Sequence, residues 1–147
     1  DNRTNLESIF RALLNSNRTI VFPLHPRTKK ALQKFDMVKN LEGSNIRVLP
    51  PLGHLDFIKL LANSKKILTD SGGIQKEAYL LKIPCITIRG ETEWIETLES
   101  GWNNLTGSSY DKILNALERM NTPKQQENFF GDGNAATKIF NIISKIN

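Results

Sequence analysis

The sequence predicts an α/β fold, a doubly wound parallel sheet of the Rossmann type with helices on both faces. Three observations lead to this prediction. Short β-rich runs alternate with amphipathic segments along nearly the whole chain, turn-forming residues separate them, and the length of 147 residues fits one domain. Strands that alternate with helices pair in parallel, because right-handed crossovers carry each helix over a face of the sheet.

The predicted strands are short runs rich in branched apolar residues, at 19–22, 46–49, 66–69, 84–88 and 104–106. Pro23 ends the first run, Pro50 ends the second and the Gly72-Gly73 pair ends the third, because these residues interrupt strands. Ligands of such sheets bind at the carboxyl ends of the strands. The informative side chains are therefore expected directly after each run.

Between the strands, apolar residues recur at helical spacing. The predicted helices are 4–15, a short basic helix after Pro26, 55–62, 74–81, 92–99, 113–120 and 136–146. Thr4 and Glu7 have the spacing of a capping box, which predicts that the first helix begins at Thr4. Residues 123–133 are predicted to form a loop.

The net charge of +5 is compatible with an anionic ligand or simply with a lysine-rich surface. The basic residues are scattered, and no stripe of aromatic and basic residues suggests base stacking, so no nucleic-acid partner is expected. No apolar run approaches the length of a membrane span, so no membrane association is expected.

The single cysteine, Cys85, lies within the apolar run 84–88. A buried structural thiol is favoured over a nucleophile, and a reducing, cytoplasmic compartment fits one unpaired cysteine. With only His25 and His54 and no cluster of Cys and His, no metal site is expected.

The most informative segment runs from Thr69 to Glu77, where a predicted strand leads through a polar turn and two glycines into a helix. The first amides of a helix lack intrahelical partners and carry partial positive charge, and glycines let a ligand approach the backbone. Ser71 adds a hydroxyl, and Glu77, one turn further on, is placed to bind a ribose diol. The sequence thus predicts a phosphate cradle. The alternative is that Ser71 only caps the helix and Glu77 only faces solvent.

Four segments in register resemble the non-hydrolysing UDP-N-acetylglucosamine 2-epimerases. Residues 67–78 resemble the signature LTDSGGIQEEA of that family. The other three segments are residues 22–26, which resemble P-x-H-P, residues 84–93, which resemble the strand and loop KPVLVMR…TE, and residues 129–135, which resemble NPYGDGxA.

The resemblance implies a GT-B-type epimerase with two Rossmann-like domains, of which residues 1–147 are the second, UDP-binding domain. It implies that Ser71, Gly72 and Gly73 meet the diphosphate, that Glu77 binds the ribose, and that the Phe57 backbone contacts uracil. It also places His25 and Arg89 along the cleft. Each of these two residues has an alternative role. His25 could instead hydrogen-bond its own turn, and Arg89 could instead meet a partner carboxylate.

The reaction implied by the resemblance interconverts UDP-N-acetylglucosamine and its manno epimer by elimination and re-addition of UDP, without a cofactor, in a pathway of cell-surface polysaccharide synthesis. The family's catalytic carboxylates lie in the N-terminal domain, so no catalytic residue is expected in this chain. Alone, the chain is expected to bind UDP weakly without turnover. The full-length protein is expected to be a homodimer.

The chain departs from the family pattern in two places. Asp1-Asn2 match the end of a segment HR-x-EN, so the preceding strand is expected to be absent, leaving an unpaired groove or edge. Trp94-Ile95 replace an Arg-Pro pair, which leaves the exact sugar open. The alternatives are an epimerase for a modified UDP-sugar such as a 2,3-diacetamido uronate, a GT-B glycosyltransferase domain, and a stand-alone nucleotide-sugar sensor.

Overall fold

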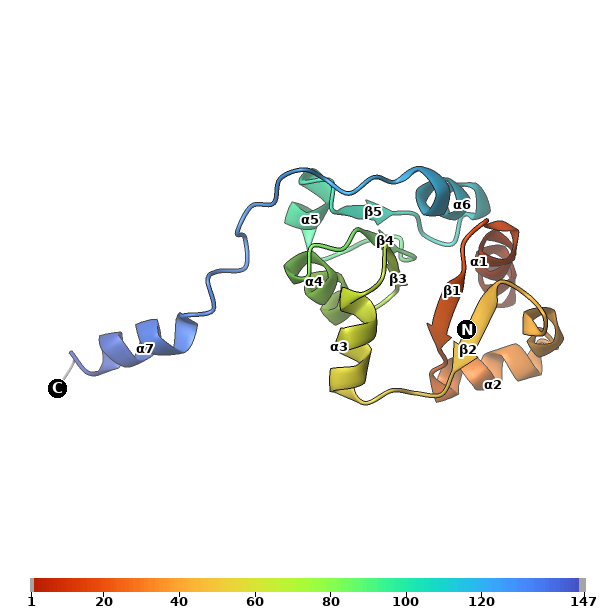
Figure 1. Cartoon of the computed structure of the whole chain (residues 1–147), viewed down its shortest axis with the longest axis horizontal. Coiled ribbons are helices and arrows are strands. Elements are labelled where there is room, and N and C mark those ends of the chain that lie inside the picture. The colour runs from red at the N-terminus through yellow and green to blue at the C-terminus, as the bar shows by residue number, and fades with distance from the viewer. Residues whose placement is uncertain (1, 146–147) are drawn as a thin grey trace.

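The computed structural model describes residues 2–145, as alternating strands and helices (Figure 1). The elements are α1 Arg3–Asn15, β1 Ile20–Pro23, α2 Pro26–Lys34, the 3-10 helix η1 Val38–Leu41, β2 Ile46–Leu49, α3 His54–Ala62, β3 Ile67–Thr69, α4 Gly72–Leu80, β4 Cys85–Thr87, α5 Ile95–Glu99, β5 Asn103–Leu105, α6 Tyr110–Arg119 and α7 Ala135–Ile143.

The strands form two parallel sheets, β1-β2 and β3-β4-β5. In the first sheet Ile20 pairs with Ile46, and in the second Ile67 pairs with Cys85, which in turn pairs with Asn103. The predicted α/β class with parallel strands is therefore confirmed. Among residues 2–145, the edge of β1 opposite β2 and the edge of β3 opposite β4 have no strand partner. In the order 3-2-1-4-5-6 of a doubly wound sheet, these edges would flank strand 1.

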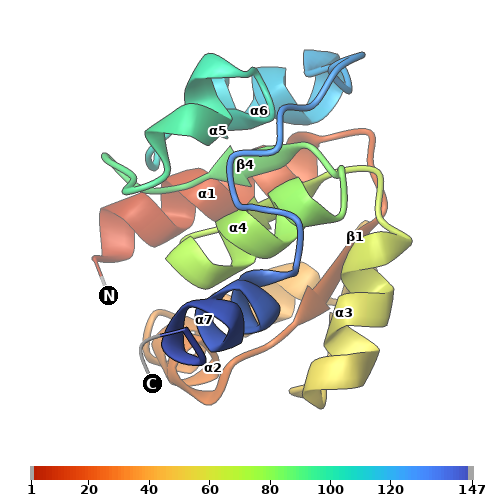
Figure 2. The ribbon, with the colours of Figure 1, turned by 90° about the vertical axis from the view of Figure 1, so that its left-hand side faces the viewer.

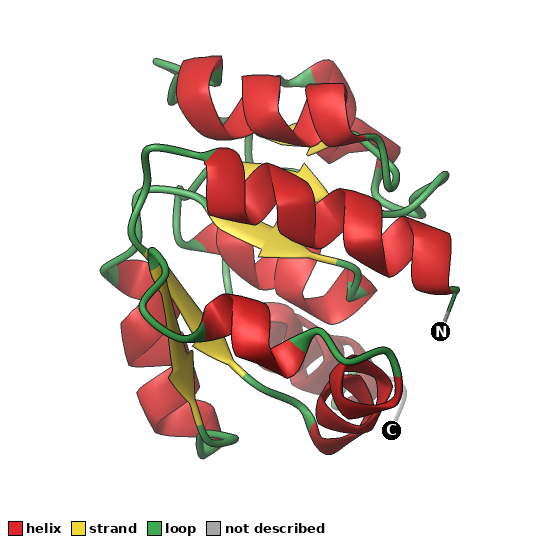
Figure 3. Ribbon diagram, turned by 90° about the vertical axis from the view of Figure 1, so that its right-hand side faces the viewer, coloured by secondary structure: helices red, strands yellow, loops and turns green. Residues whose placement is uncertain are grey.

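Side chains of the central strands alternate between two cores, because successive residues of a strand point to opposite faces. Ile86 belongs to the larger core, which also contains Phe10 and Leu13 of α1 and Ile113 and Leu117 of α6. Its neighbours Ile67 and Cys85 belong to a smaller core with α3 and α4. Figure 3 shows helices in front of and behind the strands. Helices thus cover both faces of the β3-β4-β5 sheet, as predicted, whereas β1 and β2 form a separate sheet.

Several helix ends differ from the predicted ones. The prediction that α1 begins at Thr4 is wrong: Asn2 is the N-cap and its side chain accepts a hydrogen bond from the Asn5 amide. Glu7 instead pairs with Arg3, one turn earlier, at 2.7 Å. An asparagine preceding the helix supplies a good cap, and this leaves no need for a capping box.

Helix α4 begins at Gly72, two residues earlier than predicted, because the glycines form its first turn rather than breaking the chain. Helix α5 begins later than predicted, at Ile95. The short helix η1 was not predicted at all. The predicted end of the last helix at residue 146 lies outside the described residues.

The segment after α6 crosses the molecule and leads to α7, which projects away from the rest of the chain in Figure 1. Seen from that side, α7 lies in front of the body (Figure 2). Helix α7 has no buried residue. No helix within residues 2–145 has the length and apolar character needed to cross a membrane.

Candidate functional site

The candidate site is the turn that joins β3 to α4. Ser71 is the N-cap of α4: its Oγ accepts a hydrogen bond from the Ile74 amide at 3.5 Å, and its own amide donates to Thr69 Oγ1 at 3.0 Å. Within residues 2–145 the amides of Gly72 and Gly73 have no hydrogen-bond partner. These two donors, at the positive end of a nine-residue helix, are available to an anion.

A second segment, the loop 89–94 after β4, closes over this turn. Arg89 Nη1 lies 3.1 Å from Glu93 Oε2, which is the partner carboxylate that the sequence left open for Arg89. A Cβ atom placed on Gly72 would lie only 2.0 Å from Glu93 Oε1, so the carboxylate rests directly against the Gly72 backbone. Trp94 Nε1 donates to the Gly72 carbonyl at 2.8 Å. The absence of a side chain at Gly72 is what permits this approach.

A buried polar network fixes the loop to the body. Gln75 Oε1 accepts hydrogen bonds from Thr92 Oγ1 at 2.6 Å and from Asn103 Nδ2 at 3.2 Å. Asn103 Oδ1 in turn accepts a hydrogen bond from the Thr87 hydroxyl at 2.7 Å, inside β4. Gln75 is only 1% exposed, and its Nε2 has no partner within residues 2–145. Because buried polar groups require partners, this network holds the loop in one position relative to α4.

The other predicted site residues are distributed over neighbouring elements. Glu77 is half-buried on α4, one turn and a half after Ser71. Phe57, on α3, packs against the smaller core, and its amide donates to the Gly53 carbonyl at 2.9 Å. His25 is exposed and is the N-cap of α2; its Nδ1 accepts a hydrogen bond from the Arg27 amide at 3.2 Å. The turn contact considered for His25 is therefore present.

Sequence reasoning missed Glu93 and Gln75 as parts of the site. The only local signal was the spacing of four between Arg89 and Glu93, which suits an ion pair. Nothing in the sequence connects Glu93 with Gly72, because they are 21 positions apart and meet only through the order of β3 and β4 in the sheet.

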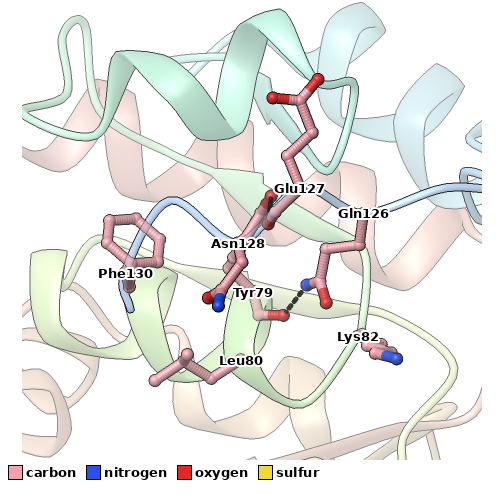
Figure 4. Close-up of a pocket in the computed structure, with 7 residues that line it drawn as sticks. All are labelled: Tyr79, Leu80, Lys82, Gln126, Glu127, Asn128 and Phe130. Atoms are coloured by element: carbon pink, nitrogen blue, oxygen red, sulfur yellow. Dashed lines mark hydrogen bonds between the residues drawn. The ribbon is translucent and has the colours of Figure 1, made fainter. Parts of the chain in front are cut away.

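An open hollow lies elsewhere, at the carboxyl-terminal half of α4 (Figure 4). It encloses about 320 Å³ where the segment after α6 crosses the helix. Tyr79 anchors that segment: its hydroxyl donates to the Glu127 carbonyl at 2.7 Å, and its own carbonyl accepts from Gln126 Nε2. The hollow is lined by side chains and carbonyl groups, and not by the helix N-terminus, so it is not the predicted phosphate cradle.

The Cys85 thiol is buried inside β4. Burial raises the pKa of the Cys85 thiol to about 11, so that the thiol stays protonated at neutral pH. Within residues 2–145, no group of three or more His, Cys, Asp or Glu side chains is placed to hold a metal ion.

Comparison with known proteins identifies the family of the chain. The family model of UDP-N-acetylglucosamine 2-epimerase matches residues 1–144. The chain belongs to this epimerase family. A UDP-N-acetylglucosamine 2-epimerase homolog of Methanococcus maripaludis is 47% identical to this chain. The match covers 99% of this chain and 42% of the length of that relative.

Two further relatives are a solved epimerase structure and an epimerase named for a different UDP-sugar. The crystal structure of the Methanocaldococcus jannaschii UDP-GlcNAc 2-epimerase in complex with UDP-GlcNAc and UDP matches with a TM-score of 0.89 at 39% identity, covering 99% of this chain and 42% of that one. The UDP-2,3-diacetamido-2,3-dideoxy-D-glucuronate 2-epimerase of Pseudomonas aeruginosa is 36% identical over 86% of this chain and 35% of its own length. The chain thus spans less than half the length of the epimerases it matches.

Two positions at which this chain departs from the family pattern contact each other. Lys76 stands where the signature has a glutamate, and Trp94 stands where the pattern TERPE has an arginine. Lys76 Nζ lies 5.1 Å from the centroid of the Trp94 ring and 5.0 Å from that of Phe130. The Lys76 ammonium thus makes cation–π contacts that attract α4 to the loop 89–94.

Proposed function

We propose that this chain is the UDP-binding part of a UDP-N-acetylglucosamine 2-epimerase and that the diphosphate binds at the amino-terminal end of α4. The observation that carries the proposal is the pair of unpartnered amides at Gly72 and Gly73, directly after β3, among residues 2–145. The carboxyl end of a parallel strand followed by a helix N-terminus is where such folds bind phosphates. The epimerase of M. jannaschii, which matches almost the whole chain, was solved with UDP-GlcNAc and UDP.

The other residues have roles that follow from their positions. Ser71 adds a hydroxyl beside the amides, and Glu77 accepts hydrogen bonds from the ribose. Arg89 neutralises phosphate charge, the Phe57 backbone contacts uracil and His25 lines the cleft. Each of these roles rests on the resemblance to the family and on the position of the residue in the fold.

The reaction proposed for the whole protein is the elimination of UDP, inversion at C2 and re-addition of UDP. As UDP leaves, negative charge develops on its diphosphate, and oriented amides stabilise developing charge without reorganisation. The chain supplies this half of the task. Proton transfer at C2 needs an acid and a base, which the family places in its other domain, so we expect no turnover from this chain alone.

Isothermal titration with UDP tests the proposal, and Gly73 offers a sharp variant. Gly73 is exposed, and a Cβ there would meet only Ser71 Oγ at 3.8 Å. Gly73→Asp places a negative charge at the helix N-terminus, which favours the helix but repels a diphosphate. We expect UDP affinity to fall at least about tenfold, or ~1.4 kcal/mol. The matched control Gly73→Asn has nearly the same shape without the charge and should bind within about threefold of the unaltered chain. Equal affinities for both variants would contradict the proposed site.

One observation favours a second substrate. Trp94 replaces the arginine of the family pattern, and the P. aeruginosa epimerase of a diacetamido uronate is 36% identical. Competition titrations of UDP-N-acetylglucosamine and UDP-2,3-diacetamido-2,3-dideoxyglucuronate against bound UDP distinguish the two. The M. maripaludis and M. jannaschii relatives favour the first sugar, so we expect it to bind more tightly.

For the full-length protein we propose a cytoplasmic homodimer, as membership of the family implies. Sedimentation equilibrium of the complete polypeptide tests the dimer, and a monomer at micromolar concentration would contradict it.

A further inference from the structure

The carboxylate of Glu93 lies against Gly72, the residue that opens the predicted phosphate cradle. Its Oε1 lies 2.0 Å from the position that a Gly72 Cβ would take, and its Cδ lies 3.0 Å from it. Gly72 is the first residue of α4, so this carboxylate is adjacent to the helix end at which negative charge is stabilised. Glu93 therefore fills the space beside the Gly72 Cα, next to an amide to which it makes no hydrogen bond, so a phosphate that binds this amide would lie close to the carboxylate.

Two contacts keep the carboxylate there. Arg89 Nη1 holds Glu93 Oε2 at 3.1 Å, and Trp94, the next residue, ties the loop to the Gly72 carbonyl at 2.8 Å. The first of these contacts is weak, because half of the Glu93 side chain is exposed and about a third of the Arg89 side chain is exposed. Ion pairs between exposed side chains contribute little and are screened by water. The Trp94 bond to backbone is independent of the carboxylate. Glu93 can therefore leave without releasing the loop.

We propose that Glu93 is an internal competitor of the diphosphate, and that Arg89 exchanges the Glu93 carboxylate for a phosphate oxygen when nucleotide binds. This inference rests on the proposed function, because it assumes that the diphosphate binds at Gly72. A carboxylate and a phosphate cannot share the position, since like charges a few ångströms apart repel each other. The arginine suits the exchange, because its planar donor group pairs with carboxylate and phosphate alike.

The exchange makes binding depend on the charge of the ligand. A diphosphate brings enough negative charge to displace Glu93 and to regain the Arg89 partner. Uridine carries no phosphate and has no interaction that replaces the carboxylate. Removal of the Glu93 charge should therefore tighten the binding of diphosphates and leave the affinity for uridine unchanged. If Glu93 only supported the loop, its removal would not distinguish the two kinds of ligand.

The test is isothermal titration of the 147-residue chain with UDP, inorganic pyrophosphate and uridine. The variant is Glu93→Gln, which keeps the size of the side chain and removes its charge. The matched control is Glu96→Gln, which makes the same charge change at an exposed residue of α5. We expect Glu93→Gln to tighten the binding of UDP and pyrophosphate about fivefold, as ~1 kcal/mol of relieved surface repulsion gives. Uridine should bind unchanged, and Glu96→Gln should stay within about twofold for every ligand.

A salt series completes the design. The gain from Glu93→Gln should shrink as ionic strength rises to about 1 M, because salt screens charges separated by more than about 3 Å there. UDP binding that is unchanged or weaker in Glu93→Gln, while the unaltered chain binds UDP, would overturn the competitor role and leave the proposed function intact. Failure of UDP to bind to every variant would overturn both.

Discussion

Helices α6 and α7 have the same kind of amphipathic sequence and opposite surroundings. In α6 the apolar residues Ile113, Ala116 and Leu117 are buried against α1 and β4. In α7 the apolar residues at the same spacing are exposed, with Phe140 at 70% and Ile142 at 62%. An apolar stripe at helical spacing thus indicates a helix and the face that needs cover, but it does not tell what covers that face.

The difference arises from what precedes each helix. Helix α6 follows β5 directly, so the sheet order places it beside α1, and Lys66 Nζ hydrogen-bonds the Ala116 and Leu117 carbonyls at its carboxyl-terminal end. Helix α7 follows the long segment after α6, whose last anchors to the body include the contacts of Tyr79 with Glu127 and Phe130. Beyond Phe130, the chain leads away from the core (Figure 1).

The largest expected effect is the loss of stability when a buried residue of α6 is truncated. Ile113 is 0% exposed, and Ile113→Ala would leave a cavity in the larger core. We expect the free energy of unfolding to fall by about 2–5 kcal/mol, measured by urea denaturation. The matched control is Ile143→Ala in α7, where the side chain is 59% exposed and a change below about 0.5 kcal/mol is expected. Equal losses at both positions would show that α7 is packed in solution.

The next largest effect is a pH dependence of the free energy of unfolding that arises from the Cys85 thiol. Burial raises the pKa of this thiol from 9.0 to about 11, so the folded state keeps the proton that the unfolded state loses. The contribution of Cys85 to stability is therefore complete below pH 9 and is lost as the pH rises towards 11. We expect a loss of about 1 kcal/mol between pH 9 and 10 from urea denaturation at each pH. Cys85→Ala should remove this part of the slope, and an unchanged slope would contradict it.

A smaller effect is expected at the end of α6. Lys66→Met removes an ammonium group that donates hydrogen bonds to two carbonyls in the last turn of α6. Burial lowers the pKa of Lys66, and this cost of burying the charge offsets part of the stability that the hydrogen bonds contribute. We expect a net loss of about 1 kcal/mol in the free energy of unfolding. Lys65→Met, at the exposed neighbour, is the control and should change stability by less than about 0.5 kcal/mol.

The smallest effect on stability is expected in α7. Phe140→Ser combined with Ile143→Ser removes exposed apolar surface and should change the midpoint of thermal unfolding little. The same variant should bind less of an apolar dye and remain monomeric at higher concentration, because exposed apolar patches promote association. A marked loss of thermal stability would mean that α7 packs against the body.

The part of the site that depends on neighbouring residues could be predicted from the sequence, and the part that depends on long-range contacts could not. Ser71 as a helix cap and the unpartnered amides after it follow from local rules, since a serine followed by two glycines after a strand favours such a turn. Glu93, Trp94 and Gln75 reach the same point through hydrogen bonds and contacts across 17 to 22 positions of sequence. No local pattern encodes those contacts. The predicted start of α1 was wrong because both Asn2 and Thr4 are residues that favour a helix N-terminus, and Asn2 is the cap.

By itself, the sequence determined the alternation of strands and helices, the parallel α/β class and the polar turn after β3. These depend on periodicity and on hydrogen bonds between residues within a few positions of each other. The tertiary structure alone decided that the strands form two sheets, that α6 is covered while α7 is not, and that Glu93 rests on Gly72. Those outcomes depend on which segments the sheet order brings together, and side-chain spacing carries no record of that order.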